Sequence, residues 1–138
     1  VALVAVPSFQ NVIENNGLAT ESNRFVSTIN FARSEAVRIG DDVSLTPNAG
    51  GFGDGWCVHL GAACNDTGAN EVLRQFQGGD VAYTNPGTLT FNSRGEMTNA
   101  SFQINIDPLD CDPGEVGKRR EITLSLAGRP SIDTGDCP

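Results

Sequence analysis

LATESNRFVSTINFARSEAVRIG, residues 18–40, has the residue spacing of a single amphipathic helix. Its small and apolar side chains recur at intervals of three and four residues, which places them on one face of a helix. This stripe consists of Leu18, Ser22, Phe25, Val26, Ile29, Ala32, Ala36 and Val37. The polar residues that fall mostly off the stripe are Glu14, Glu21, Arg24, Thr28, Glu35 and Arg38. We expect Phe25 and Ile29 to be buried against another element. Glu21, Arg24 and Arg38 should face water.

The helical spacing extends back to Pro7 and stops at Ile39. Proline is tolerated in the first turn of a helix, and Gly40 stands where a helix-ending glycine is common. The sequence therefore predicts a helix over residues 7–39. No other segment has a comparable helical period.

After Gly40 the pattern changes to short alternating segments separated by turn residues. Strands are predicted at 43–46, 56–60, 71–77, 81–83, 88–91, 101–106 and 121–126. In the last segment, Ile122, Leu124 and Leu126 share one face. Strands at this spacing without a second helix favour antiparallel sheet, on which the helix must bury its stripe. The sequence thus predicts one α+β domain, with an N-terminal part over residues 1–40 that contains this helix and a β-rich globular part over residues 41–138.

Composition limits the classes of function. A chain of 138 residues fits one domain, and its 38% hydrophobic and 19% charged residues argue against disorder. The formal net charge is −8 and the isoelectric point is near 4.4. Nucleic-acid binding through bulk charge is therefore not expected, because phosphate groups bind to positive surfaces.

The four cysteines are Cys57, Cys64, Cys111 and Cys137. They form no C-x-x-C motif and the chain has one histidine, so disulfides are favoured over a zinc site. Disulfides imply an oxidising compartment. Of three connectivities we favour Cys57–Cys64, which would staple a hairpin-like connection, together with Cys111–Cys137, which would tie the C-terminus to a loop.

No catalytic or cofactor site is predicted. A single histidine, His59, with scattered aspartates does not indicate a Ser–His–Asp triad. The acidic segment 107–115 carries oxygen ligands that calcium prefers, but it lacks the EF-hand order. We interpret it as a solvated loop and predict no metal site.

The first ten residues, VALVAVPSFQ, contain a short apolar run without an initiator methionine. We interpret this run as the end of a longer apolar helix. Because spanning a membrane takes about 20 residues, we expect roughly 15–25 further, mostly apolar residues to precede Val1. The alternative is the ordinary start of a buried helix.

Several segments together resemble the type IV pilin class. They are Ala5-Val6-Pro7-Ser8-Phe9 and Asn30-Phe31-Ala32-Arg33-Ser34-Glu35-Ala36-Val37-Arg38-Ile39-Gly40, followed by 55–56, 89–95, 119–125 and 128–129. Within that class the chain resembles minor pilins of the FimU and FimT type and the minor pseudopilin GspH of type II secretion.

The resemblance implies a pilin-like fold, in which a long N-terminal helix packs on antiparallel sheets arranged as a sandwich or roll. It also implies a cleaved leader and an apolar helix that holds the subunit in the bacterial inner membrane, with the globular part in the periplasm, before assembly into a filament. The implied partners are other minor and major pilin subunits, and the implied role is pilus initiation or tip assembly, with motility or adhesion. The implied alternative is a type II secretion pseudopilin. The isolated domain should be mainly monomeric, and no enzymatic activity is expected.

Some FimT-type relatives bind DNA through basic residues near a C-terminal G-R-x-R segment. The corresponding candidates here are Lys118, Arg119, Arg120 and Arg129. The segment at 128–131 reads G-R-P-S, so Ser131 replaces the second arginine. This departure and the negative net charge both disfavour DNA binding.

Overall fold

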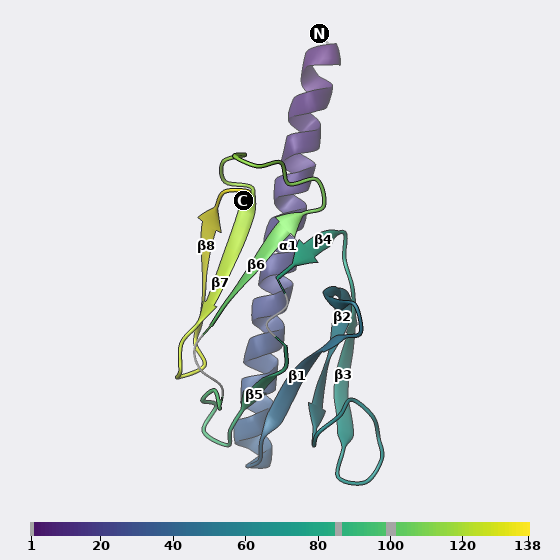
Figure 1. Ribbon diagram of the computed structural model, residues 1–138, viewed down its shortest axis with the longest axis vertical. Coiled ribbons are helices and arrows are strands. Elements are labelled where there is room, and N and C mark those ends of the chain that lie inside the picture. The colour runs from purple at the N-terminus through teal and green to yellow at the C-terminus, as the bar shows by residue number, and fades with distance from the viewer. Residues whose placement is uncertain (1, 85–86, 99–101) are drawn as a thin grey trace.

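The computed structural model describes residues 2–84, 87–98 and 102–138. This part of the chain forms one long helix and two four-stranded antiparallel sheets. The elements are α1 (Ala2–Ile39), β1 (Val43–Asn48), β2 (Gly51–Leu60), β3 (Glu71–Gln77), β4 (Val81–Tyr83), β5 (Leu89–Phe91), β6 (Phe102–Pro108), β7 (Arg119–Leu124) and β8 (Pro130–Gly135). The helix runs along the long axis of the molecule, and its N-terminal end stands clear of the sheets (Figure 1).

The two sheets are interleaved along the sequence. The strand order is β3-β2-β1-β5 in the first sheet and β4-β6-β7-β8 in the second. After β3 the chain crosses to the second sheet for β4, returns to the first for β5, and crosses again for β6. Both sheets contact α1, which they flank over its C-terminal part (Figure 1).

The helix stripe forms the centre of the core. Leu18, Phe25, Ile29, Ala32 and Ala36 are each at most 1% exposed. The expectation that Phe25 and Ile29 are buried against the sheets is therefore confirmed. Core residues also come from both sheets, namely Val43, Leu45, Phe52, Trp56, Val58, Val81, Leu89, Phe91, Met97, Ile104, Ile106, Ile122 and Leu124.

An aromatic cluster surrounds Phe25. Its ring centroid lies 5.2 Å from Phe52 and 5.3 Å from Trp56, both edge-on, and 5.5 Å from Tyr83. Trp56 in turn stacks on Phe76 with centroids 5.6 Å apart. Edge-to-face pairs of this kind add about 0.5–1.5 kcal/mol beyond the burial of apolar area. One helix residue therefore ties β2 to β4 across the two sheets.

Three positions of the helix differ from the sequence prediction. Val37 is 56% exposed, because Ala36 takes the core-facing position next to it and residue 37 is rotated towards the side of the helix. Thr28 is only 1% exposed: its hydroxyl donates to the carbonyl of Arg24 and accepts from Nε1 of Trp56. The side chain of Glu21 is 14% exposed, because the β3–β4 connection covers it.

The C-terminal strands also differ from the prediction. Leu126 was expected on the buried face of β7, but this strand ends at Leu124 and Leu126 is 61% exposed in the turn that follows. Strand β8 was not predicted, because it is an edge strand whose residues are mostly exposed and lack apolar alternation. Strand β2 begins at Gly51, ahead of the predicted start at residue 56. Residue 101 of the predicted strand 101–106 lies outside the described residues.

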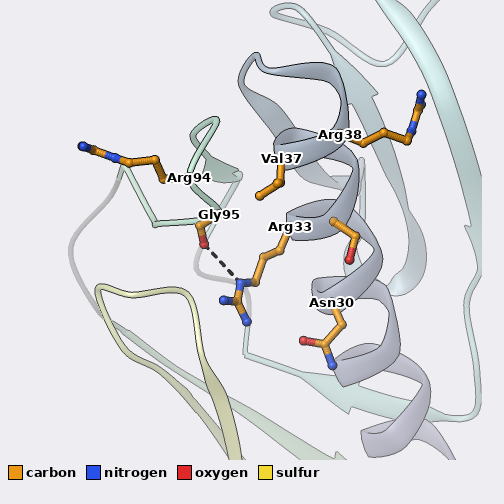
Figure 2. A pocket seen from close by; sticks show the side chains of 7 residues that line it. Asn30, Arg33, Val37, Arg38, Arg94 and Gly95 are labelled. Atoms are coloured by element: carbon orange, nitrogen blue, oxygen red, sulfur yellow. Dashed lines mark hydrogen bonds between the residues drawn. The ribbon is translucent and has the colours of Figure 1, made fainter.

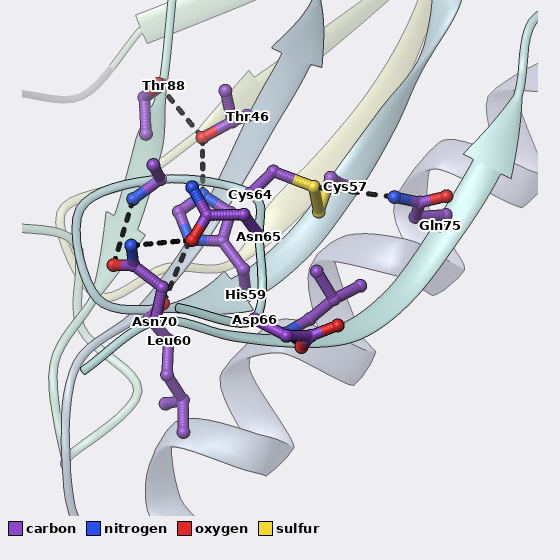
Figure 3. The surroundings of a disulfide bond; sticks show 12 residues. Thr46, Cys57, His59, Leu60, Cys64, Asn65, Asp66, Asn70, Gln75 and Thr88 are labelled. Atoms are coloured by element: carbon purple, nitrogen blue, oxygen red, sulfur yellow. Dashed lines mark hydrogen bonds between the residues drawn. A yellow bond between two sulfur atoms is a disulfide. The ribbon is translucent and has the colours of Figure 1, made fainter. Parts of the chain in front are cut away.

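Two disulfides join the pairs favoured from the sequence. Cys57 of β2 is bonded to Cys64 of the following loop, and Cys111 is bonded to Cys137 near the C-terminus. The first bond fastens the loop over residues 61–70 to β2 (Figure 3). The second closes a much longer stretch of chain, with a sequence separation of 26 against 7. In the chain-entropy account, longer closed loops give the larger stabilisation.

Replacement of Ile29 by alanine tests the stripe. Because Ile29 is 0% exposed, Ile29→Ala should lower the free energy of unfolding by about 2–5 kcal/mol. Val37→Ala, on the same helix but 56% exposed, is the matched control and should change it by less than about 0.5 kcal/mol. Urea denaturation followed by circular dichroism measures both. Equal effects of the two substitutions would contradict the packing described here.

Candidate functional site

No group of side chains suited to holding a metal is found in the described part of the chain. Among these residues, no three or more histidine, cysteine, aspartate or glutamate side chains are grouped so that they could bind an ion. His59 is 1% exposed, and its Nε2 lies 2.7 Å from the hydroxyl oxygen of Thr46 beneath the loop over residues 61–70 (Figure 3). In the described part of the chain, the ring nitrogens of His59 contact the hydroxyl of Thr46 and the carbonyl of Leu60 rather than an aspartate.

The basic residues that the sequence suggested do not form a shared patch. Arg119 makes a two-pronged ion pair with Asp107, with Nε–Oδ1 at 2.7 Å and Nη2–Oδ2 at 2.8 Å. Both side chains are 16% exposed, and the hydrogen bond to Asp107 raises the pKa of Arg119. Arg120 points to the opposite face of β7, as alternation requires, and donates to the carbonyls of Gly117 and Arg119. Lys118 directly precedes β7.

Arg129 lies at the other end of β7. It follows the turn after this strand, where its carbonyl accepts from the amide of Ser125. Ser125 follows Arg120 by five positions, which in an extended strand corresponds to roughly 17 Å between the two residues. The exposed Arg129 is therefore remote from the other three basic residues.

An open groove lies between α1 and the turn after β5. It has a volume of about 500 Å³ and is lined by Asn30, Arg33, Ser34, Val37, Arg38, Arg94 and Gly95. Figure 2 shows Arg33 and Val37 directed from the helix towards Gly95, whereas the side chain of Arg38 points away from that turn. Sequence reasoning missed this groove, because residues 92–97 come next to the helix only through the sheet topology.

Arg33 forms one end of the groove and fastens two turns to the helix. Its Nε donates to the carbonyl of Gly95 at 3.1 Å, and its Nη2 donates to the carbonyl of Ala127 at 3.4 Å. A side chain at Gly128 would place a Cβ 2.4 Å from the Gly95 oxygen and 2.9 Å from Arg33 Nε, and φ of Gly128 is +81°. Glycine is therefore required at this close approach.

Ion pairs on the rim of the groove are at the surface. Arg38 Nη2 lies 2.6 Å from Glu35 Oε2, and Arg94 Nε lies 2.8 Å from Glu96 Oε1. The hydrogen bond between Arg38 and Glu35 lowers the pKa of Glu35 and raises that of Arg38. Exposed pairs of this kind contribute about 0–1 kcal/mol, so they can exchange partners at low cost.

A partly buried polar network holds the helix against β4. The hydroxyl of Tyr83 donates to Glu21 Oε2 at 2.8 Å, and Arg24 Nη1 donates to Glu21 Oε1 at 2.9 Å. Arg24 also donates to the carbonyl of Gln77, and its guanidinium lies 4.7 Å from the ring centroid of Trp56. Arg24 was expected to face water, but these contacts leave its side chain only 29% exposed. The pKa of Tyr83 is raised well above its usual value, mainly by burial and secondly by the hydrogen bond to Glu21.

The chain is similar to known proteins both in sequence family and in fold. The family model described as type II transport protein GspH matches residues 21–128, more than half of the chain. The chain belongs to the GspH family. GspH-family members are minor pilins and pseudopilins of type IV pili or type II secretion, structural subunits that assemble with one another into periplasmic or surface filaments. No curated protein matches the chain significantly.

Solved structures of GspH-like subunits have the same fold. A crystal form of the type IV minor pilin FimU of Pseudomonas aeruginosa gives a TM-score of 0.72 at 21% identity, covering 87% of this chain and 90% of FimU. The minor pseudopilin EpsH of Vibrio cholerae gives 0.54 at 17% identity, covering 86% and 97%. The pilin-like α+β fold expected from the sequence is therefore confirmed. Within the described ranges, no helix combines the length and hydropathy needed to cross a membrane.

The pKa of Tyr83 leads to a prediction about alkaline pH. A raised folded-state pKa means that the contribution of Tyr83 to stability is complete below its unfolded pKa near 10 and is lost as the pH rises further. Tyr83 is the only tyrosine, so absorbance at 295 nm reports its ionisation alone. In the folded protein this signal should stay flat through pH 10 and rise only with unfolding, whereas urea-unfolded protein should titrate near 10. A midpoint near 10 with unchanged circular dichroism would contradict the buried network.

The placement of the basic residues predicts poor DNA binding. Arg119 is paired with Asp107, and Arg129 lies at the far end of β7. Few of the basic side chains can therefore contact neighbouring phosphates of one DNA site at the same time. Fluorescence anisotropy with duplex DNA at about 150 mM salt should show weak binding, changed little by Arg119→Glu/Arg120→Glu. Tight, salt-sensitive binding that this variant abolishes would overturn the prediction.

Proposed function

We propose that the protein is a minor pilin subunit of a type IV pilus, which contributes to pilus initiation or tip assembly and to pilus-dependent motility or adhesion. The observation that carries the proposal is the form of α1. Its C-terminal part is buried under both sheets, while its N-terminal end stands clear of them (Figure 1). Such a helix can present the globular part rigidly while its free end packs against other subunits.

The energetics of assembly fit this arrangement. Residues 1–6 are all small or apolar, and we propose that they continue a longer apolar helix that anchors the subunit in the inner membrane before assembly. At roughly 25 cal/mol per Å², burying such a helix among others contributes more than a small polar contact between globular parts. The partners are other minor and major pilin subunits.

The choice of a pilus over a secretion system rests on the fold comparison. FimU, whose printed description is a type IV minor pilin, gives the higher TM-score, 0.72 against 0.54 for the pseudopilin EpsH. A GspH-type role in type II secretion is the alternative function. A FimT-like role in DNA uptake is a further alternative, which the separation of Arg129 from Arg119 and Arg120 disfavours.

Deletion of the gene, followed by complementation, separates these functions. Loss of surface filaments and of surface motility, with unchanged secretion of exoproteins and unchanged DNA uptake, is the expected result. Restoration should fail with Val4→Glu, which puts a charge in the projecting apolar segment, and succeed with Asn11→Glu, which puts the same charge at a polar position of the same helix. Defective secretion with normal filaments would favour the pseudopilin instead.

A further inference from the structure

Exposed apolar side chains gather at the two ends of the globular part. Six large hydrophobic side chains are exposed among those whose burial the structure describes, and three of them lie near the C-terminal end of α1 and the turn after β7. They are Val37, Ile39 and Leu126, and the groove described above is beside them. Two others, Leu109 at 71% and Val116 at 81% exposure, lie in the loop between β6 and β7 at the opposite end (Figure 1).

The β6–β7 loop is acidic as well as apolar. Residues 109–116 read LDCDPGEV, with Asp110, Asp112 and Glu115 and no basic residue. Hydrogen bonds fix its shape: the amide of Asp112 donates to Glu115 Oε1 at 3.0 Å, and the amide of Cys137 donates to the carbonyl of Glu115 at 2.9 Å. The Cys111–Cys137 disulfide ties it further. A loop held in this way loses little conformational entropy on binding.

The groove carries the complementary features. Arg33 lies on the helix side and Arg94 on the turn side, where its side chain extends away from the helix (Figure 2). Val37, which is 56% exposed, offers an apolar surface on the helix side. The Arg94 side chain is 80% exposed and pairs with Glu96 at the surface. Because such exposed ion pairs are weak, Arg94 can exchange Glu96 for another carboxylate at low cost. Within the described residues, the hydrogen bonds of Arg33 go to carbonyl oxygens rather than to a carboxylate. The loop at one end of the globular part is thus negatively charged and the groove at the other end carries arginines, and both have exposed apolar side chains.

We propose that the groove binds the acidic β6–β7 loop of a second copy of this chain, so that globular parts associate head to tail. A molecule cannot make this contact with itself, because its loop and its groove lie at opposite ends of the globular part (Figure 1). A contact between two different surfaces is heterologous, and its repetition gives an open chain rather than a closed dimer. The proposal deepens the proposed function and rests on it, since it treats the protein as an assembly subunit. The contact is weak, because its ion pairs are at the surface.

Two complementary variants test this arrangement in the isolated chain. The groove variant Val37→Ser/Arg94→Ser removes the apolar and the positive side chain without adding a negative one and keeps its loop, and the loop variant Asp110→Lys/Asp112→Lys keeps its groove. Sedimentation velocity at low salt should show concentration-dependent association of the wild type and at least about tenfold weaker association of each variant alone. An equimolar mixture should form a 1:1 heterodimer and stop there, since only one intact groove meets one intact loop. High salt should abolish the heterodimer.

A charge-matched control and a separate readout complete the test. Asp54→Lys/Asp80→Lys makes the same change of charge at exposed residues outside the loop and should associate like the wild type. A wild-type protein that stays monomeric at millimolar concentration, or variants that form no heterodimer on mixing, would overturn the inference. Loss of filaments on gene deletion combined with a monomeric domain would overturn this contact alone and leave the proposed function standing.

Discussion

The burial of one helix face under two sheets is the constraint on which the rest of the structure depends. Phe25 and Ile29 are fully buried, and the aromatic cluster around Phe25 reaches strands of both sheets. In the described part of the chain both sheets pack against α1, so removing the helix would expose their inner faces to water. The C-terminal part of the helix and the two sheets therefore share one hydrophobic core.

Much of this architecture could be predicted from local patterns. The stripe at three- and four-residue intervals located α1, and alternation located the buried face of β7. Strand β8 could not be predicted in the same way. Its residues are mostly exposed, and it is held by pairing with β7 rather than by apolar packing, so it leaves no hydrophobic period. Val37 and Leu126 were misplaced because periodicity does not show where the covering layer ends.

The surface could be predicted less well than the core. The disulfide pairs followed from the sequence spacing of the cysteines, whereas the groove depends on a contact between Arg33 and Gly95, 62 residues apart. The basic run Lys118–Arg120 looked like a patch in the sequence. Adjacent residues of a strand point to opposite faces, however, so Arg119 and Arg120 do not share a face. In addition, Asp107 on the adjacent strand β6 pairs with Arg119. Cross-strand partners decide whether a run of like charges is available to a ligand.

The interleaved order of the strands has a consequence for how the chain acquires its structure. Strand β5 pairs with β1 only after the chain has already contributed β4 to the other sheet, so the first sheet cannot be completed from a continuous segment. Such non-local pairing makes folding slow and cooperative. Ile122 and Leu124, which help to cover α1, lie near the end of the sequence. A chain released before β7 is made would expose the stripe around Phe25 to water, and it would be prone to aggregation until the last strands arrive.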